Sequence, residues 1–415
     1  MIIFLEKLSS YIWGGGLIFL LLVTGAIYTV KLGFIQFKTL PYLIKNSKKG
    51  NKSDKEGISQ WKTVCMSLGT AMGTGNITGV ASALALGGAG AIFWMWISAL
   101  LGMALVYAEN SLSVIYSDSD YKGPMAYLSK GVGSRILAVI FAVMCLGAAF
   151  GMGGMIQVSS LTESIKGCAD VNTYAVAAII FLIIFAVTSG GAKRIGSAAQ
   201  TLLPLASILY TIVCIILLIK FKDNFSSAFK SIFGQALGFR QVSGGTAGYA
   251  VSVGIRRGIF SNEAGLGSSP ILHSAAESDS PKLQGMWSMF EVFFDTMICC
   301  TLTALVILSA SPDGTVAGAF SRVLGSYSDL FLSLEMAVFA FCTVIGWYYC
   351  GETAYKFLTG RVSGKKFSLI FSAAASLGAV LSLNTIWILS DIFNGLMAFP
   401  NLLGLILLIK KVKKE

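Results

Sequence analysis

Two short stretches of this chain combine glycine with hydroxyl and amide side chains inside otherwise apolar segments. The first is GTAMGTGNITGV, residues 69–80, and the second is GIFSNEAGLGSSP, residues 258–270. Such residues weaken a membrane helix, and each freed backbone group is costly in hydrocarbon unless something pairs with it. Freed N–H groups at a helix N-terminus can bind a carboxylate, and freed carbonyls can coordinate a dehydrated cation. These two stretches could therefore bind a carboxylate and a cation.

Two interpretations of these glycine-rich stretches compete. In the binding interpretation, the donors and amide side chains come from Thr74, Gly75, Asn76, Ser261, Asn262 and Gly265. In the packing interpretation, small residues let neighbouring helices approach closely, and the residues concerned are Gly69, Gly73, Gly75 and Gly79. Each stretch carries an asparagine, and the two interruptions occupy corresponding positions in the chain, which favours the binding interpretation.

The composition indicates a membrane protein. Of 415 residues, 55% are hydrophobic and only 12% are charged, against roughly 25% charged in soluble domains. Apolar runs of about 20 residues, enough to cross a hydrocarbon core of about 30 Å, recur along the chain. The first run lacks the basic start and cleavage site of a signal peptide, so we expect it to be retained. The eleven predicted membrane helices cover residues 11–30, 61–86, 91–116, 135–163, 172–189, 197–219, 246–274, 284–310, 328–352, 367–384 and 386–409.

The predicted helices divide into one extra N-terminal helix and two groups of five. Two consecutive groups with an odd number of helices must insert in opposite directions, which is the arrangement of transporters built from inverted repeats. The first helix of each group carries the glycine-rich interruption. We therefore expect four regions: an N-terminal helix with a basic cytoplasmic loop at 1–60, a first repeat at 61–220, an extracellular amphipathic connection at 221–245, and a second repeat with a basic cytoplasmic tail at 246–415.

The net charge of +11, from 31 Lys and Arg against 20 Asp and Glu, follows the predicted topology. Basic residues gather at 45–62 and in the tail KKVKKE, while Lys220, Lys222, Lys230 and Arg240 lie on the opposite side. The positive-inside rule then places the N-terminus outside and the C-terminus in the cytoplasm, across a prokaryotic cell membrane. This distribution accounts for the charge without a nucleic-acid partner.

Rival functions have less support in the sequence. The eight cysteines lie mostly in apolar runs without metal-type spacing, so we expect no zinc site, disulfide framework or cofactor. An intramembrane protease would need an activated nucleophile, and His273 is the only histidine, placed beside an apolar segment near a helix end. A channel would present a continuous polar pore, whereas two offset helix breaks fit an occluded site better.

Five longer blocks resemble the alanine or glycine:cation symporters, a family with the LeuT-type fold. The blocks are GTGNITGVASALALGG, GAIFWMWISALLGMALVYAE, RGIFSNEAGLGSSPILHSAA, FEVFFDTMICCTLTALVIL and GWYYCGE. The resemblance implies an all-α LeuT-type core with two discontinuous helices. It also implies sodium-coupled uptake of small neutral amino acids such as alanine and glycine. A proton-coupled carrier of the same fold is the closer alternative, and a channel is the more remote one.

The resemblance further implies which residues bind substrate and ion. It places the amino acid at Thr74, Gly75, Asn76, Gln157, Asn262, Gly265, Thr343 and Trp347. Sodium would be held by backbone carbonyls near Gly69 and Met72 and by the Thr343 hydroxyl.

Some of these assignments have structural alternatives. Gln157 could simply bridge two helices, and Trp347 could be a packing residue or an interfacial anchor. The sequence also departs from the family pattern, which usually has asparagine at the position of Gly154 and again near Ser159. The departures leave the transporter assignment intact and the substrate preference open.

Charged residues inside the predicted spans must be paired, protonated or near water, because a lone ionised side chain at the bilayer centre costs roughly 2.5–3.5 kcal/mol. These residues are Glu109, Glu163, Arg257, Glu263, Glu291, Asp295 and Glu335. Glu291 and Asp295 stand four residues apart on one helical face, where two carboxylates repel. Either one of them holds a proton, or they pair with Arg256 or Arg257. Glu263 could cap the N-terminus of a half-helix.

The sequence thus predicts an alternating-access transporter that works as a monomer in the lipid bilayer. Its partners would be a small neutral amino acid and a sodium ion, it would catalyse no covalent chemistry, and it would need no cofactor besides the coupling ion.

Overall fold

The computed structural model describes residues 2–46, 58–118, 120–236, 246–276, 280–361, 364–381 and 383–413. Within these ranges the chain is helical, apart from loops and one isolated bridge between Ile58 and Ala276. Among the described residues, seven helices are long and apolar enough to cross a membrane, so the predicted all-α membrane architecture is confirmed, while the count of eleven spans stays a prediction. Most of the predicted basic loop, residues 47–57, and Arg240 lie outside the described residues.

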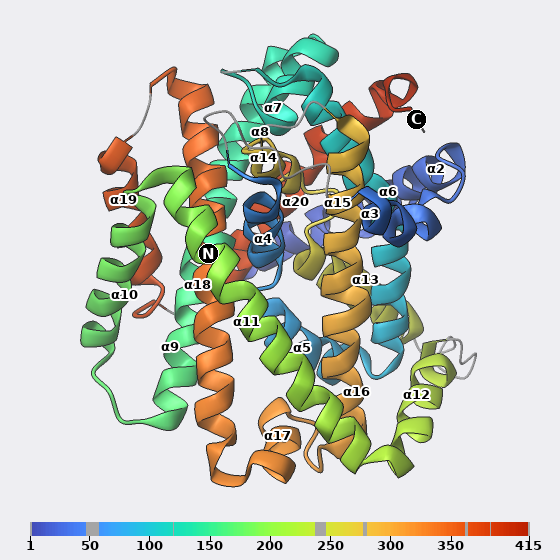
Figure 1. Ribbon diagram of the computed structural model, residues 1–415, viewed down its shortest axis with the longest axis vertical. Coiled ribbons are helices and arrows are strands. Elements are labelled where there is room, and N and C mark those ends of the chain that lie inside the picture. Colours follow the sequence, from blue (N-terminus) through green and yellow to red (C-terminus); the bar gives the residue numbers. More distant parts are fainter. Residues whose placement is uncertain are drawn as a thin grey trace.

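The N-terminal part of the chain begins with two helices, α1 (Ile2–Ile12) and α2 (Gly15–Lys31). The span expected at 11–30 is therefore interrupted near Trp13 and Gly14, and its long helix begins at Gly15. The helices that follow are α3 (Thr39–Asn46), α4 (Gln60–Ala71), α5 (Thr78–Gly87), α6 (Gly90–Tyr116), α7 (Gly123–Ala126), α8 (Arg135–Ala148), α9 (Gln157–Cys168), α10 (Thr173–Thr188) and α11 (Gly191–Lys220). Figure 1 shows these helices in blue to green.

In the second part of the chain, a broken helix is again followed by longer helices. Its helices are α12 (Lys222–Ala236), α13 (Thr246–Asn262), α14 (Ser269–His273), α15 (Pro281–Val292), α16 (Thr301–Ala310), α17 (Val316–Leu324), α18 (Ser328–Thr359), α19 (Gly364–Leu377) and α20 (Leu383–Leu407). The predicted amphipathic connection contains α12, and residues 237–245 of it lie outside the described part of the chain. The inverted relation of the two groups of five stays a prediction.

Two π-helical segments join consecutive helices near the middle of the molecule. The segment η4 (Ala149–Ile156) links α8 to α9, and η6 (Phe293–Cys300) links α15 to α16. Wider helical turns of this kind are frequent at functional sites, and they shift the register of the side chains that follow.

Both expected helix breaks are present. The first separates α4 from α5 and contains Gly73 in an extended conformation, followed by a single turn, η2 (Thr74–Asn76). The second separates α13 from α14, where Glu263, Gly265 and Gly267 have φ values of 56°, 85° and 85°. Glycine adopts positive φ without steric cost, which explains why this loop needs its glycines.

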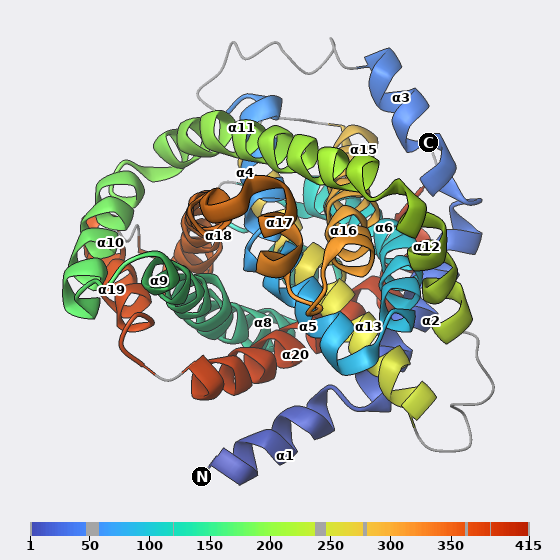
Figure 2. The same ribbon diagram turned by 90° about the horizontal axis from the view of Figure 1, so that it is seen from below.

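Neighbouring helices pack closely around the two breaks. A Cβ added at Gly254 of α13 would lie 2.3 Å from the Ala91 carbonyl oxygen of α6. Helix α6 also packs against α15, and α15 packs against α4. Helix α18 contacts α4, α8, α9 and α11. Figure 2 shows the broken helices towards the middle, with α8, α9, α11, α18 and α20 around one side of them.

Candidate functional site

The two helix breaks meet each other inside the bundle. A Cβ added at Gly75 in the first break would lie 3.6 Å from the Ser261 Cα and 3.7 Å from the Phe260 ring at the end of α13. Both segments are buried. The expected juxtaposition of the two interruptions is therefore what the structure shows.

Asp295 of η6 connects the two breaks through hydrogen bonds. Asn76 Nδ2 donates to Asp295 Oδ1 at 2.7 Å, which ties the carboxylate to the first break. Ser261 Oγ donates to Asp295 Oδ2 at 2.8 Å, which ties it to the second. Thr296 Oγ1 also donates to Oδ2 at 2.8 Å. With the Asp295 side chain fully buried, the carboxylate and its three donors form the polar centre of the bundle.

The charge of Asp295 has no basic partner among the ion pairs of the described residues. Three neutral donors stabilise a carboxylate but do not cancel its charge, and a buried uncompensated charge is very costly. The arrangement is therefore chemically suited to hold a cation or a proton at Asp295.

The predicted pairing of Glu291 or Asp295 with Arg256 or Arg257 is wrong. Arg256 Nη2 lies 3.1 Å from an oxygen of Asp391 on α20. The Arg257 guanidinium lies over the Trp387 ring, 5.1 Å from its centre. Both arginines lie on α13 before the break and contact α20 rather than η6, and Glu291 pairs with His273 instead.

A second cluster gathers around the first break on the side of α9 and α18. The Thr74 backbone N–H donates to Gln157 Oε1 at 3.2 Å. The Thr343 hydroxyl donates to the Gly69 carbonyl oxygen at 3.1 Å. A Cβ at Gly73 would lie 2.7 Å from the Thr343 hydroxyl and 3.0 Å from Gln157 Oε1. The structure thus brings together residues expected to bind sodium and residues expected to bind substrate.

The Thr74 hydroxyl lies at this cluster without a hydrogen-bond partner among the described residues, although it is buried. An unpaired buried hydroxyl costs free energy, and such a group in a native structure calls for a partner that the chain does not supply. Thr74 is therefore the residue of the first break that is most open to a ligand.

Three other expected site residues contact groups outside this cluster. Gly265 faces α2, because a Cβ there would lie 2.4 Å from a Leu21 methyl carbon, and its carbonyl accepts from Asn401 Nδ2 at 2.9 Å. The Met72 sulfur lies 3.8 Å from the Ser207 hydroxyl. The Trp347 indole N–H donates to Glu263 at 2.8 Å.

Side chains of the second break are used mainly to hold its own turn. Asn262 Nδ2 donates to Thr296 Oγ1 at 3.1 Å, and Asn262 Oδ1 accepts from the Ala264 N–H at 3.0 Å. Glu263 accepts from the hydroxyl of Ser268, the residue before α14, and from Trp347. The expectation that Glu263 caps the N-terminus of a half-helix is wrong, because no side chain of the described residues caps a backbone N–H of α14 and Glu263 bonds the Ser268 hydroxyl instead.

Sequence reasoning missed the role of Thr296, and it placed Asp295 among charges of unknown role. Thr296 bonds both Asp295 and Asn262, so it links the carboxylate to the second break. The sequence pattern did not reveal this role, because Asp295 and Thr296 lie in the π-helical η6, where an α-helical spacing predicts the wrong face of the helix.

The departure from the family pattern at Gly154 lies at a helix contact. A Cβ on Gly154 would lie 3.2 Å from the Ala375 Cβ of α19. It is the preceding residue, Gly153, that packs directly against Trp347. The Gly154 position therefore affects the packing of η4 against α19 more directly than the cluster at the first break.

A cavity of about 860 Å³ leads to the break from one side. Ile77, Thr78 and Gly79, which follow the first break, line it together with residues of α9, α13, α17, α18 and α20. Its charged lining residues are Glu163, Arg257 and Asp391, so two of the predicted intramembrane charges face space large enough for water. We call this cavity the vestibule.

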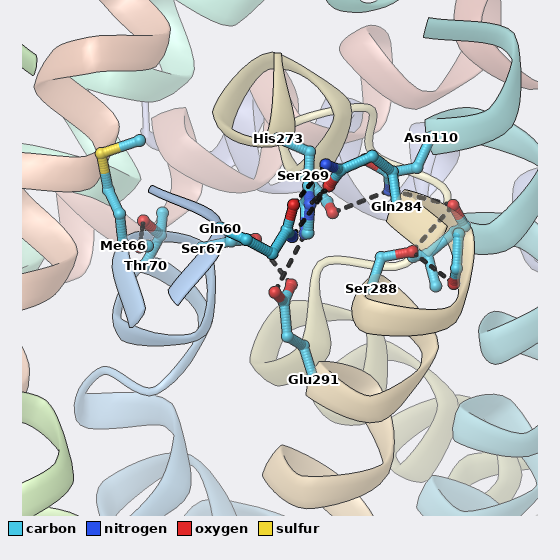
Figure 3. A network of polar contacts seen from close by, with 12 residues as sticks. Gln60, Met66, Ser67, Thr70, Asn110, Ser269, His273, Gln284, Ser288 and Glu291 are labelled. Atoms are coloured by element: carbon cyan, nitrogen blue, oxygen red, sulfur yellow. Dashed lines mark hydrogen bonds and ion pairs between the residues drawn. The ribbon is translucent and has the colours of Figure 1, made fainter. Parts of the chain in front are cut away.

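The opposite side of the breaks is sealed by a polar network between α4, α14 and α15, which we call the closed side (Figure 3). His273 Nε2 lies 2.9 Å from Glu291 Oε1, and Ser67 Oγ donates to Glu291 Oε2 at 2.7 Å. Gln284 Nε2 donates to Gln60 Oε1 at 2.6 Å. All of these side chains are buried, so the site is reached from the vestibule and shut on this side.

Comparison with known proteins agrees with this geometry. The whole chain, residues 1–415, matches the model of the sodium:alanine symporter family. It is 37% identical to the sodium/alanine symporter AgcS of Methanococcus maripaludis, over 99% of this chain and 95% of AgcS. It is 34% identical to the amino-acid carrier protein AlsT of Bacillus subtilis, over 96% of this chain and 88% of AlsT. The solved structure of MhsT in complex with L-phenylalanine matches with a TM-score of 0.65 at 16% identity, over 84% of this chain and 89% of that one, which confirms the LeuT-type fold.

The packing at Gly73 can be tested against a matched glycine of the same broken helix. Gly73→Ala should lower stability by about 1–3 kcal/mol, because the added methyl group overpacks Thr343 and Gln157. Gly79→Ala meets no atom within 4 Å and should be neutral or stabilising by up to about 1 kcal/mol, because alanine favours the helix. Thermal unfolding of the purified variants measures both, and equal effects would contradict the tight packing at Gly73.

Proposed function

The chain belongs to the sodium:alanine symporter family, and we propose that it takes up small neutral amino acids such as alanine and glycine together with sodium. The observation that carries this proposal is the buried Asp295 carboxylate held by both helix breaks. A cation bound there replaces the missing positive charge. The bound cation also fixes the two breaks relative to each other.

Sodium binding fits two positions next to the breaks. At the first, Asp295 supplies the charge, and Asn76 and Ser261 supply neutral oxygens. At the second, the Gly69 carbonyl and the Thr343 hydroxyl already face each other, and the carbonyl of Met72 completes the set. Hard cations prefer such oxygen ligands.

The amino acid fits between these positions. We assign its carboxylate to the backbone of Gly75 and to the Thr74 hydroxyl, and its remaining polar contacts to Asn76 and Gln157. Trp347 closes the pocket behind Gly153, which limits the side chain to a small one. Asn262 and Gly265 contribute indirectly, by shaping the second break.

Transport then proceeds by alternating access. The positive-inside rule makes the vestibule side extracellular and the closed side cytoplasmic. Sodium and the amino acid enter through the vestibule, the vestibule closes, and the closed side opens when α4 moves away from α15. One sodium ion crossing 100 mV releases about 2.3 kcal/mol, which concentrates a zwitterion roughly 50-fold. One coupling ion is therefore sufficient for useful uptake.

Proton coupling is the second candidate, because a proton on Asp295 would remove the same charge as a cation. Uptake of labelled amino acids into proteoliposomes, with either a sodium gradient or a proton gradient imposed, separates the two. We expect accumulation of alanine and glycine that saturates, requires sodium and shows counterflow. Accumulation with a proton gradient alone would favour the second candidate. Flux that neither saturates nor follows either gradient would indicate a channel and contradict the proposal.

The Thr74 hydroxyl should contact the amino acid. Thr74→Val keeps the shape of the side chain but removes the hydroxyl, and the loss of one hydrogen bond of about 1.4 kcal/mol should raise KM about tenfold. The matched control is Thr63→Val, since the Thr63 hydroxyl is also buried without a partner among the described residues but lies on α4, away from the break. If both variants show the same KM, Thr74 does not bind the substrate.

The charge of Asp295 should be needed for sodium dependence. Asp295→Asn keeps the size of the side chain and removes the charge, so sodium should no longer raise the unfolding temperature or stimulate uptake. Glu335→Gln neutralises another buried carboxylate, on α18, and should keep both sodium effects. Normal sodium stimulation in Asp295→Asn would rule out a cation at this carboxylate.

A further inference from the structure

The single histidine of the chain, His273, is buried in the network that seals the closed side. It lies at the end of α14, and both of its ring nitrogens have oxygen neighbours. Nδ1 lies 2.6 Å from Gln284 Oε1, and Nε2 lies 2.9 Å from Glu291 Oε1. Figure 3 shows the ring between these two side chains. A nitrogen that faces an acceptor must carry a proton, and a ring with protons on both nitrogens is positively charged.

The partners of Gln284 and Glu291 support this assignment of protons. Gln284 exchanges two hydrogen bonds with Gln60, at 2.6 Å and 3.2 Å, and in this arrangement its Oε1 also faces His273 Nδ1. The Ser67 hydroxyl donates to the second oxygen of Glu291, and a donated bond stabilises the ionised carboxylate. With the Gln284 amide in this orientation, the geometry suits an imidazolium next to a carboxylate, and the remaining polar atoms of both groups have partners.

The same network ties the moving half-helix to its neighbours. Gln60 and Ser67 belong to α4, whereas Gln284 and Glu291 belong to α15. If the closed side opens by withdrawal of α4, the bonds from Ser67 and Gln60 must break. Glu291 then loses a donor, the Gln284 amide is released, and water reaches the histidine. The protonated His273–Glu291 pair is therefore favoured in the sealed conformation.

We propose that His273 and Glu291 form a proton-binding site that is occupied while the closed side is sealed and that releases its proton when α4 withdraws. The ligand is a single proton, and it sits on His273 Nε2 in a hydrogen bond to Glu291. This inference rests on the proposed transport cycle for the motion of α4, and it is separate from the sodium position at Asp295.

Titratable groups near the His273–Glu291 pair favour its protonated state. Cys65 of α4 and Glu263 of the second break are titratable groups that interact electrostatically with Glu291. Because Glu263 is acidic, it disfavours a deprotonated pair with a net negative charge. Several other ionisable groups on the elements around the pair contact partners elsewhere: Lys62 contacts Ser197, Glu109 contacts Asn401, Lys122 contacts Tyr349, Lys282 lies over Tyr42, Asp295 contacts Asn76, Tyr107 contacts Lys413 and Cys350 contacts Ser268.

Linkage gives the direction of the pH effect. A proton bound only in the sealed conformation stabilises that conformation, so a low pH on the cytoplasmic side opposes opening and a high pH favours it. For one linked proton, the opening equilibrium changes by at most about tenfold per pH unit. Transport limited by opening of this side should therefore speed up as the pH rises, until the site is empty.

The proton can be observed directly, because a chain with one histidine gives an unambiguous signal after labelling with ¹⁵N-histidine. In lipid nanodiscs without substrate, at about pH 7, we expect NMR to show protons on both ring nitrogens. Glu291→Gln should leave a neutral ring with one bare nitrogen. Ser67→Ala should retain the charged ring but lose it at a lower pH than the wild type does, and it covers the case in which Glu291→Gln fails to fold. The matched control, Glu335→Gln, should give the wild-type signal.

Transport supplies the second readout. Equilibrium exchange of labelled alanine, with equal pH on both sides of the proteoliposome, has no proton gradient to drive it. The wild-type exchange rate should rise with pH, and in Glu291→Gln this rise should be absent. A neutral ring in the wild type at or below neutral pH overturns the proton site, and an unchanged pH profile in Glu291→Gln overturns its link to opening. The NMR result needs no transported substrate, so it stands or falls independently of the proposed function.

Discussion

The need to pair backbone groups of two interrupted helices inside a membrane dominates this structure. At the second break the protein meets this need itself: Asn262 accepts from the backbone, Asn401 donates to the Gly265 carbonyl, and Glu263 reaches Ser268. At the first break Gln157 accepts from the Thr74 N–H, but the Thr74 hydroxyl has no partner in the described part of the chain. The two breaks therefore differ in kind, the second as a braced turn and the first as the surface left open to a ligand.

The buried acidic residues differ in the partners of their carboxylates. Glu109 bonds to an amide, Glu263 to an indole and a hydroxyl, and Glu291 to the only histidine. Asp295 has three neutral donors and contacts both breaks, but no positively charged group among the described residues pairs with it. Glu109, Glu263 and Glu335 likewise have no ion pair among the described residues, so what distinguishes Asp295 is that its carboxylate contacts both breaks.

The sequence predicted the broken helices well, because glycine, threonine and asparagine clustered at one point of an apolar run weaken the helix there. It also grouped Thr74, Gln157 and Thr343 correctly near the first break. It failed where side-chain direction depends on tertiary structure. The π-helical η6 turns Asp295 and Thr296 towards the breaks rather than towards an arginine, and the turn at Gly265 points that residue at α2. Neither a π-helical turn nor the facing helix can be read from spacing alone.

The position of Asp295 also gives a physical reason for coupling under the proposed function. A substrate carboxylate bound at Gly75 would approach the Asp295 carboxylate, because Gly75 and Asn76 are adjacent and Asn76 bonds Asp295. Two negative charges in a poorly solvated site repel strongly. A sodium ion placed between them turns that repulsion into two attractions, so each ligand raises the affinity of the other, and this effect is necessarily reciprocal. Symport then requires no separate coupling device, since neither the ion nor the amino acid binds well without the other.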